Sequence, residues 1–503
     1  MIKSSKDGQM DTKTLDDEPS KAVLDLVHEA EAEHNDQAVS RAILWKIDLR
    51  LLPLLCITYA LQSIDKTTLG YASVFDLKED LSLTGNEYSW LGGIFYLGYL
   101  LWEFPTNLML QRLPINYFMS MTVIIWGIVL MCHASVKNFS EIAAARTFLG
   151  VFEGSINPGT MLLFSMYYSR EEQPLRMGIW IGSAGLGYVI AGISSFGIGH
   201  IHSYLESWRL IFLIWGAITT GWGVVLLFFL PGSPLKAKFL TEHERALAIN
   251  RVKSNNTGIE NKHFKMPQFW EAMFDMKTWL LFLFAVTSNS PNGGLTTFQS
   301  LIIKGMGFST LQTTLIQMPS GAVQLIACPL ACSIFASYVR NSRLPIMLIC
   351  LAPFFASVCG LWLIDESKPY GRLVCLWISF TYTATWTLSM AVATANTAGH
   401  TKKITTNAML LIGYCLGNFV GPFFFKSDQA PGYSLGVGMM FFCIAVQVFC
   451  LVGIWVLLWA RNRKRSRFIQ GVSPDNNDPA VQGYERGLLD ETDLENPYFK
   501  YVY

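Results

Sequence analysis

Residues 51–72 read LLPLLCITYALQSIDKTTLGYA, an apolar run that contains the charged dipeptide Asp65-Lys66. About 20 apolar residues are enough for a helix to cross the hydrocarbon core of a membrane, because each residue adds 1.5 Å. Counted from Leu51, the dipeptide lies roughly 21 Å along such a helix, well inside the bilayer. The run therefore predicts a membrane-spanning helix that carries two charges at depth.

Two charges at this depth need a structural explanation. An ionised side chain inside a bilayer costs roughly 3 kcal/mol or more unless a partner or a water-filled cavity relieves it. Neighbouring residues point about 100° apart on a helix, so Asp65 and Lys66 cannot simply neutralise each other. At least one of them must face other helices. A buried structural ion pair is one interpretation; the interpretation we favour is a site for a solute and protons.

The composition agrees with a membrane protein. The chain has 503 residues, of which 51% are hydrophobic, and a mean hydropathy of +0.33, which is too apolar for a soluble protein of this size. The formal net charge is only +1, so no nucleic acid or other polyanion is expected as a partner. The cysteines lie in or beside apolar runs, which argues against disulfides and metal sites. No HExxH, nucleophile elbow or metal-ligand spacing is present, so we do not expect an enzyme.

The apolar runs predict an all-α membrane protein with twelve transmembrane helices. The longest polar interval, 231–277, divides them into two six-helix bundles, 48–230 and 278–460. Polar tails, 1–47 and 461–503, flank the bundles, and we expect the last 40 residues to be mobile. The spans are expected near 49–71, 88–110, 117–136, 140–167, 175–199, 208–230, 279–303, 309–338, 344–364, 371–397, 404–425 and 434–460.

The distribution of Lys and Arg predicts the orientation, because cytoplasmic loops carry an excess of both. One set of segments holds many such residues, among them Arg112, Lys402, Lys403, Arg245, Arg251, Arg461, Arg463, Lys464 and Arg465. The opposite loops hold little beyond Lys78, Lys137, Lys304, Lys368 and Lys426. Both termini are therefore expected in the cytoplasm. Within the central loop, residues 240–252 are expected to form an amphipathic helix on the cytoplasmic membrane surface.

Further charges lie in the second and fourth expected spans. Arg146 and Glu153 are seven residues apart, which places both on one face of the fourth span, roughly 10 Å apart along it. With helix tilt, Asp65, Lys66, Arg146 and Glu153 could therefore line one cavity. Glu103 lies late in the second span, near its cytoplasmic end, where a second proton site and a structural pair are equally compatible with the sequence.

Two spans carry glycines that predict unusual packing. Gly178 and Gly182 form a GxxxG in the glycine-rich fifth span, which favours close helix contacts, either sliding or static. The seventh span contains Ser290-Pro-Asn-Gly-Gly294, which is expected to interrupt the helix. Asn292 is then a candidate ligand contact, and a plain kink is the alternative. His400, after the tenth span, is expected at the cytoplasmic mouth as a gate or a surface residue.

With these residues in view, the chain resembles the major facilitator superfamily and, within it, the fungal allantoate permease family of anion:cation symporters. The resemblance rests on residues 64–70 (IDKTTLG), 105–112 (PTNLMLQR), 146–154 (RTFLGVFEG), 230–234 (LPGSP), 291–294 (PNGG), 396–402 (NTAGHTK) and 428–433 (DQAPGY). It implies two bundles that rock about a central site. It also implies proton-coupled uptake of a small organic anion, such as allantoate, a vitamin acid or a small peptide.

The resemblance also implies roles for individual residues. Asp65 and Glu153 are similar to a protonatable pair, Lys66 to the cation that meets a substrate carboxylate, and Arg146 to the residue that tunes the acids. Asn292 is a further candidate for substrate binding, and Glu103, Arg112 and His400 are candidates for gating at the cytoplasmic mouth. No cofactor is expected beyond a proton gradient.

Three functions remain open from the sequence. The first is a monomeric plasma-membrane symporter that imports an organic anion with protons. The second is an exporter of a fungal secondary metabolite on the same fold. The third is a nutrient receptor that kept the fold without transporting.

Overall fold

The computed structural model describes residues 37–169, 172–253, 264–335, 343–471 and 490–503, and within them the chain is helical. The first half contains α2 (Gln37–Val74), α3 (Leu77–Asp80), α4 (Glu87–Arg112), α5 (Ile115–Cys132), α6 (Phe139–Glu153), α7 (Ile156–Tyr167), α8 (Gln173–Ile198) and α9 (Ser207–Phe229). The central segment contains α10 (Glu242–Lys253) and α11 (Met266–Phe274). The second half contains α12 (Met276–Gly305), α13 (Thr310–Ile316), α14 (Met318–Pro329), α16 (Arg343–Leu363), α17 (Pro369–Ser379), α18 (Tyr382–Ala395), α19 (His400–Val420) and α20 (Ser434–Gly471).

The helices match the expected twelve spans. Nine helical segments of the described chain are long and apolar enough to cross a membrane. The second and seventh expected spans fall on α4 and α12. The fourth falls on α6 and α7, which follow each other with a short break at Gly154-Ser155. The fold prediction of an all-α protein with two six-helix bundles is confirmed.

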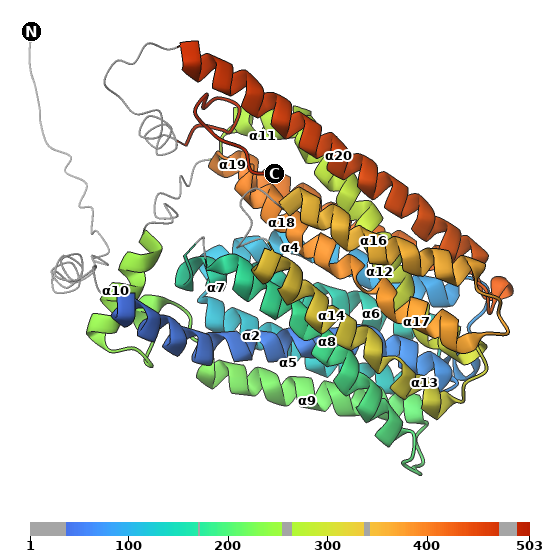
Figure 1. Ribbon diagram of the computed structural model, residues 1–503. Coiled ribbons are helices and arrows are strands. Elements are labelled where there is room, and N and C mark those ends of the chain that lie inside the picture. The colour runs from blue at the N-terminus through green and yellow to red at the C-terminus, as the bar shows by residue number, and fades with distance from the viewer. Residues whose placement is uncertain (1–36, 170–171, 254–263, 336–342, 472–489) are drawn as a thin grey trace, which may run out of the picture.

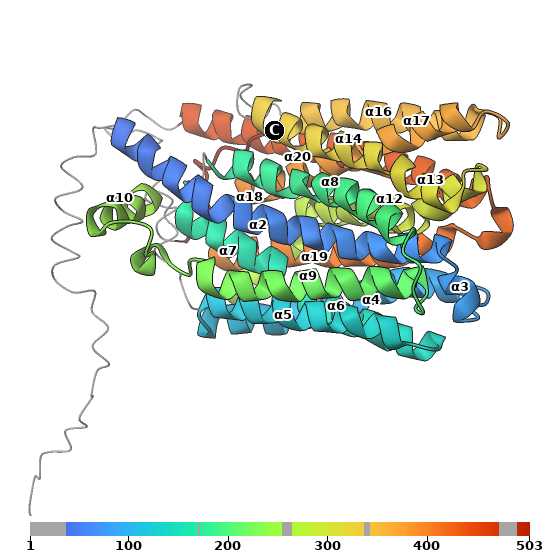
Figure 2. The same ribbon diagram turned by 90° about the horizontal axis from the view of Figure 1, so that it is seen from below.

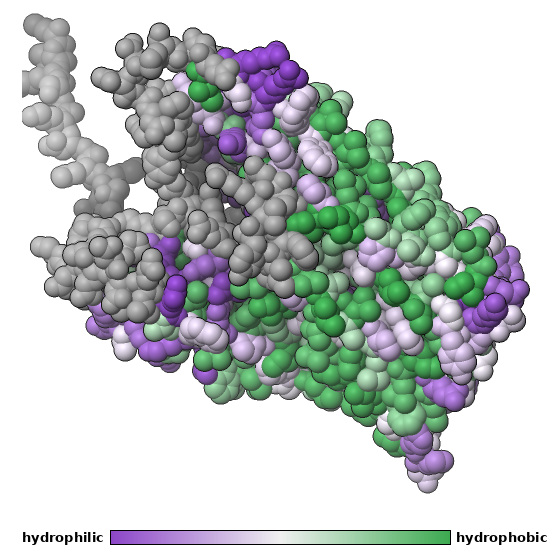
Figure 3. All heavy atoms as spheres, viewed as in Figure 1, coloured by the Kyte–Doolittle hydropathy of each residue, from purple (hydrophilic) through white to green (hydrophobic). Residues whose placement is uncertain are grey.

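The long helices run side by side and form one elongated bundle (Figures 1 and 2). In Figure 2, α5, α6 and α9 of the first half lie toward the bottom and α14, α16 and α17 of the second half toward the top, while α19 of the second half is seen between α2 and α9. We call the end at which α2 begins and α20 ends the termini side, and the opposite end the far side. On the face shown in Figure 3, hydrophobic side chains cover the middle of the helices and hydrophilic ones gather at both ends, as a lipid-facing belt requires.

Caps in the sequence fix where several helices start. The Asp275 side chain accepts a hydrogen bond from the backbone N–H of Lys277 (3.0 Å) and begins α12. The Asn138 side chain does the same for Glu141 (2.9 Å) at α6. Such caps satisfy N–H groups that have no partner within the helix.

The two halves meet along three helix pairs: α2 with α12, α4 with α19, and α8 with α14. Glycines make the last contact possible. A Cβ built at Gly185 would lie 2.2 Å from the backbone oxygen of Gly321, and one at Gly182 would lie 3.0 Å from Pro329. A Cβ built at Gly178 would lie 2.9 Å from the Cβ of Cys332. The fifth span therefore packs closely through its small residues, as expected from its sequence.

On the far side, polar contacts join the two halves. The Tyr88 hydroxyl donates to the backbone oxygen of Thr297 (2.8 Å). The Lys304 ammonium donates to the backbone oxygen of Val74 at the end of α2 (3.1 Å). The Trp90 ring packs edge-on against Phe419 and Phe423 of the second half, with centroids 5.7 Å and 5.2 Å away. These contacts hold the far side of the interface together.

Several expectations from the sequence were wrong. The Ser290–Gly294 segment does not interrupt its helix, since α12 continues from Met276 to Gly305 with Pro291 inside it. Its glycines instead allow α19 to approach closely, because a Cβ at Gly293 would lie 2.3 Å from the backbone oxygen of Asn418. Both flanking helices reach into the expected tails, because α2 begins at Gln37 and α20 ends at Gly471.

The central segment and the chain end also differ from expectation. The amphipathic interval 240–252 forms α10, but its Ala246 and Ala248 are buried against the protein. The helix with an exposed aromatic face is α11, through Trp270 (53% exposed) and Phe274 (82%). This helix was not predicted from the sequence. Residues 490–503, expected to be mobile, are instead packed against the second half, with Tyr501 fully buried.

Candidate functional site

The dipeptide in α2 divides its two charges between different environments. Asp65 is fully buried, whereas the Lys66 side chain retains 15% exposure. The Lys66 ammonium lies 3.2 Å from a carboxylate oxygen of Glu153, which is fully buried at the end of α6. It also lies 5.7 Å from the centre of the Phe95 ring in α4. Lys66 is thus the accessible member of a buried ion pair.

Asp65 and Arg146 complete the charged group around this pair. Both are buried, and the charges of Glu153, Arg146 and Lys66 all act on the Asp65 carboxyl. The oxygens of Asp65 and two guanidinium nitrogens of Arg146 have no hydrogen-bond partner among the described residues. The structure therefore brings together the four residues that the sequence singled out and leaves part of their hydrogen-bonding capacity unused. We call this group the central charge cluster.

Aromatic side chains near Lys66 connect to aromatic side chains of the second half. The Tyr96 ring of α4 lies 5.9 Å from Tyr414 of α19, and Trp386 of α18 stacks on Tyr414 at 5.4 Å. The charge of Lys66 acts on Tyr96 and on Tyr188 of α8. The ion pair consequently lies where the two halves meet, among rings that offer flat apolar faces and hydroxyl groups.

Asn292 lies in α12 and belongs to a network within the second half. Its amide nitrogen donates to the side-chain oxygen of Asn418 in α19 (2.7 Å). Its own side-chain oxygen accepts from the Tyr382 hydroxyl of α18 (2.6 Å). Because both ends of the amide are engaged, Asn292 joins three helices in this conformation.

The three residues predicted at the cytoplasmic mouth occupy different positions. Arg112 is exposed at the last residue of α4, on the termini side. His400 begins α19 on the same side, and its backbone N–H donates to Asp490 (2.6 Å). Glu103 lies deeper in α4, where its charge acts on Tyr99 and on Cys415 of α19. Arg112 and His400 thus lie on the termini side, and Glu103 lies further along α4 toward the middle of the bundle.

Sequence reasoning missed several buried polar neighbours of the cluster. Gln62 lies one turn before Asp65 in α2, is fully buried, and lies beside Glu153. Trp126 of α5 lies beside the Asp65 carboxyl. His133 is fully buried at the end of α5, stacks on Phe212 and lies in the field of Arg146. A signal existed for Gln62, because glutamine in an apolar span four residues before Lys66 shares its helix face.

No group of three metal-ligating side chains occurs in the part of the chain that the structure describes. The cysteines are free there, and Cys328 and Cys332 are buried as packing residues. The Cys328 thiol donates to the Thr383 hydroxyl (3.3 Å).

Comparison with known proteins decides the family. The model of the Major Facilitator Superfamily matches residues 55–422, which run from the middle of α2 to the end of α19. The chain belongs to the major facilitator superfamily. Its resemblance to a family of transporters, noted from the sequence, is confirmed.

Curated relatives and solved structures agree with this membership of the major facilitator superfamily. The chain is 38% identical to the MFS-type transporter cnsL of Penicillium expansum over 92% of this chain and 88% of the relative. It is 33% identical to the allantoate permease of Saccharomyces cerevisiae over 95% of this chain and 89% of the relative. A bacterial homologue of the human lysosomal transporter Spinster, solved in an inward-facing unoccupied conformation, shares the fold with a TM-score of 0.58 and 18% identity. That match covers 84% of this chain and 97% of the other. The protein is therefore a secondary transporter of the major facilitator superfamily and not an enzyme.

Proposed function

We propose that this transporter imports a small organic anion together with protons, and that the central charge cluster performs both tasks. The observation that carries the proposal is the 3.2 Å pair between partly exposed Lys66 and fully buried Glu153. A carboxylate that arrives between the two halves can reach Lys66 but not Glu153. The solute and Glu153 therefore compete for one ammonium group.

This competition couples solute binding to proton binding. When a solute carboxylate takes Lys66, Glu153 is left as a buried anion without its cation. An unpaired buried charge costs several kcal/mol, and a carboxylate avoids this cost by taking up a proton. Solute and proton then travel together. Asp65 extends the scheme, because its carboxyl is fully buried beside the Trp126 ring and can hold a second proton.

Asn292 is proposed to take part in substrate binding from the second half. Its amide lies among Tyr382 and Asn418, and a solute that reaches these groups would join the two halves around Lys66. The interlocked far side must then part for the solute to enter from there. Arg112, His400 and Glu103 are proposed to act at the opposite opening.

The proposal includes an orientation and a location. Arg and Lys are concentrated on the termini side, in α10, α20 and the end of α4, which supports a cytoplasmic termini side. The transporter would work in the plasma membrane. The four residues of the central charge cluster lie within a single chain, so the proposed mechanism needs no second copy of the protein.

The experiment is uptake by yeast that lacks its own related permeases. Cells producing the protein are offered a panel of labelled carboxylates (ureides, vitamin acids and small peptides) at pH 5 and pH 7. We expect uptake that is higher at pH 5, collapses with a protonophore, and is lost in Lys66→Met. Uptake of a carboxylate that survives Lys66→Met, or that ignores the protonophore, contradicts the proposal. Cells that accumulate less solute when they produce the protein would indicate export.

A further inference from the structure

Residues 490–503 lie on the termini side against α11, α19 and α20, where the C-terminus is marked in Figure 1. We call them the C-terminal strap. Their contacts differ from those of a polar tail resting on a surface. Thr492, Asp493 and Tyr501 are each fully buried, and Asn496 is 3% exposed.

The centre of the strap is a carboxylate held between two lysines. The Asp493 oxygens lie 2.9 Å from the ammonium of Lys277 in α12 and 2.8 Å from that of Lys402 in α19. All three side chains are at most 1% exposed. We call Lys277 and Lys402 the lysine pair. Asp275 also contacts Lys402 (3.2 Å), but its other oxygen binds Arg461 of α20 (2.7 Å).

This balance of charge shows what the strap supplies. Lys277, Lys402 and Arg461 are three cations at one place, and Asp275 is the only fully buried aspartate that the helical part of the described chain offers them. Glu271 of α11 supplies a further carboxylate, 2.8 Å from the Lys402 ammonium, but its side chain remains 21% exposed. Asp493 therefore contributes the anion that buried lysines require.

Tyr501 is the second anchor. Its hydroxyl donates to the Asp493 carboxylate (2.9 Å), and its ring lies 5.6 Å from the Lys277 ammonium. Arg461 and Arg465 of α20 flank the same ring at 5.7 Å and 4.5 Å. A carboxylate and an aromatic ring, eight residues apart in the strap, thus converge on one cationic site.

Two asparagines recognise the strap backbone beside this anchor. The Asn462 side chain donates to the backbone oxygen of Tyr501 (2.9 Å) and accepts from its N–H (3.0 Å). The Asn396 side chain makes the same two bonds to Val502, at 2.8 Å and 2.7 Å. A side-chain amide that satisfies both backbone groups of one residue is a typical means of holding an extended peptide.

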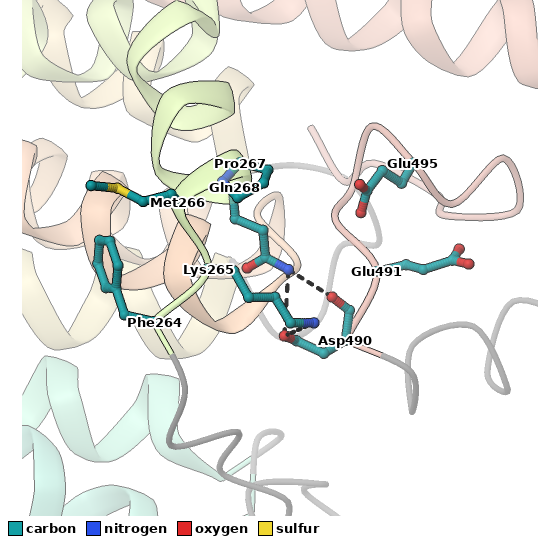
Figure 4. A pocket seen from close by; sticks show the side chains of 8 residues that line it. All are labelled: Phe264, Lys265, Met266, Pro267, Gln268, Asp490, Glu491 and Glu495. Carbon is teal, nitrogen blue, oxygen red and sulfur yellow. Dashed lines mark hydrogen bonds and ion pairs between the residues drawn. The ribbon is translucent and has the colours of Figure 1, made fainter.

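The other end of the strap holds the central segment. The Asp490 carboxylate binds the Lys265 ammonium (2.8 Å) and the N–H of His400, and its backbone oxygen accepts from Gln268 (2.8 Å). Figure 4 shows Lys265 and Gln268 pointing toward Asp490 in the lining of a pocket. Since Lys265 and Gln268 precede α12, this contact fixes the end of the segment that connects the two halves.

We propose that the termini-side ends of α11, α12, α19 and α20 form a binding site for the chain's own C-terminal strap, selective for an aspartate and a tyrosine eight residues apart. The bound strap clamps these helices and the end of the central segment together. The ligand is an acidic peptide with an aromatic anchor, and the site is separate from the central charge cluster.

Hydrogen exchange, followed by mass spectrometry on the purified full-length protein, tests whether the site recognises the strap. We expect the amides of Tyr501 and Val502 to exchange at least ten-fold more slowly than an unfolded peptide. Asp493→Asn is expected to abolish most of this protection. Glu495→Gln is the matched control, because Glu495 is an exposed carboxylate of the same strap that only accepts from the Thr492 backbone. Unprotected amides in the unaltered protein, or equal protection in both variants, would overturn the proposal.

A second measurement tests recognition in the full-length protein. The Asp493→Asn variant, whose own strap is expected to be released, is mixed with a fluorescent peptide of residues 490–503, and peptide binding is read by anisotropy. We expect saturable binding that the peptide with Asp493→Asn loses at least ten-fold. Equal binding of both peptides, or stronger binding of an unrelated acidic peptide, would show that the cationic site recognises charge alone.

Discussion

Replacing Lys66 by methionine separates the two roles proposed for the central ion pair. The change keeps most of the side chain's length and removes its charge, so Glu153, which is fully buried, loses the cation 3.2 Å away. Removing one partner of a buried pair costs about 3–5 kcal/mol as long as the other stays charged. Glu153 has an alternative, which is to bind a proton.

Proton binding limits the cost and makes it depend on pH. An ordinary glutamic acid has a pKa of about 4.3, and each pH unit above it adds about 1.4 kcal/mol to the price of holding a proton. That amounts to about 4 kcal/mol at pH 7 and about 1 kcal/mol at pH 5. Lys66→Met is therefore expected to destabilise the protein strongly at pH 7 and weakly at pH 5.

Thermal unfolding of the purified protein at both pH values measures this difference. The double variant Lys66→Met with Glu153→Gln carries no charge at either position, so its stability should recover at pH 7 while transport stays lost. Lys426→Met is the control, because Lys426 is exposed and its loss should change stability by no more than about 0.5 kcal/mol. If Lys66→Met is equally stable at both pH values, or the double variant recovers nothing, Glu153 does not depend on Lys66 and the coupling scheme is refuted.

Three further outcomes follow from the geometry. Gly185→Ala should lower the free energy of unfolding by about 1–3 kcal/mol and reduce transport, because the added Cβ would lie 2.2 Å from the backbone oxygen of Gly321. Gly197→Ala is the control, because a Cβ there meets open space, and it should change neither the unfolding free energy nor transport. Thermal unfolding and uptake assays measure the two effects. Tyr382→Phe should cost about 1–3 kcal/mol in unfolding free energy, since it removes the donor to Asn292; an unchanged value would mean that the amide finds another partner. Strap protection in hydrogen exchange should be constant from pH 8 to pH 5 and decline only below about pH 4. Burial raises the pKa of Asp493, but the lysine pair outweighs this effect and leaves the pKa below its ordinary value. The stabilisation is therefore fully present above the ordinary pKa of an aspartate and disappears as pH falls through the lowered pKa of the folded protein. Loss of protection near pH 6 would contradict that assignment.

The local features of the fold could be predicted from the sequence because each depends on a short stretch of chain. Apolar runs give the spans, and a charge inside a run identifies a position that needs a partner. Asp65, Lys66, Arg146 and Glu153 stood out for this reason, and the structure places them together. Glycines spaced four apart in the fifth span predicted a close contact that α8 makes with α14.

The remaining features depend on partners far away in the chain. Lys402 looked like one of many cytoplasmic surface charges, because nothing near it in sequence shows that Asp493 buries it. Pro291 was predicted to break its helix, yet α12 is continuous. Gly293 instead allows the backbone of α19 to pack closely against α12. Composition predicted a mobile tail, since polar residues seldom bury themselves without partners; the partners here are lysines and asparagines on other helices.

The central charge cluster and the lysine pair both bind a carboxylate through lysine, but solvent reaches only the first of them. Lys66 keeps 15% exposure and pairs with a carboxylate of a neighbouring helix, so a dissolved anion can compete for it. The lysine pair is at most 1% exposed, and its carboxylate arrives on a tethered strap. A short tether gives an effective concentration in the millimolar range, which a dissolved competitor present at micromolar levels cannot match. Exchange of the carboxylate partner is therefore expected at the central charge cluster during each transport cycle, while the strap stays bound. In these two proposals, a buried ion pair of the same kind serves transport where solvent reaches it and helix clamping where the chain itself excludes solvent.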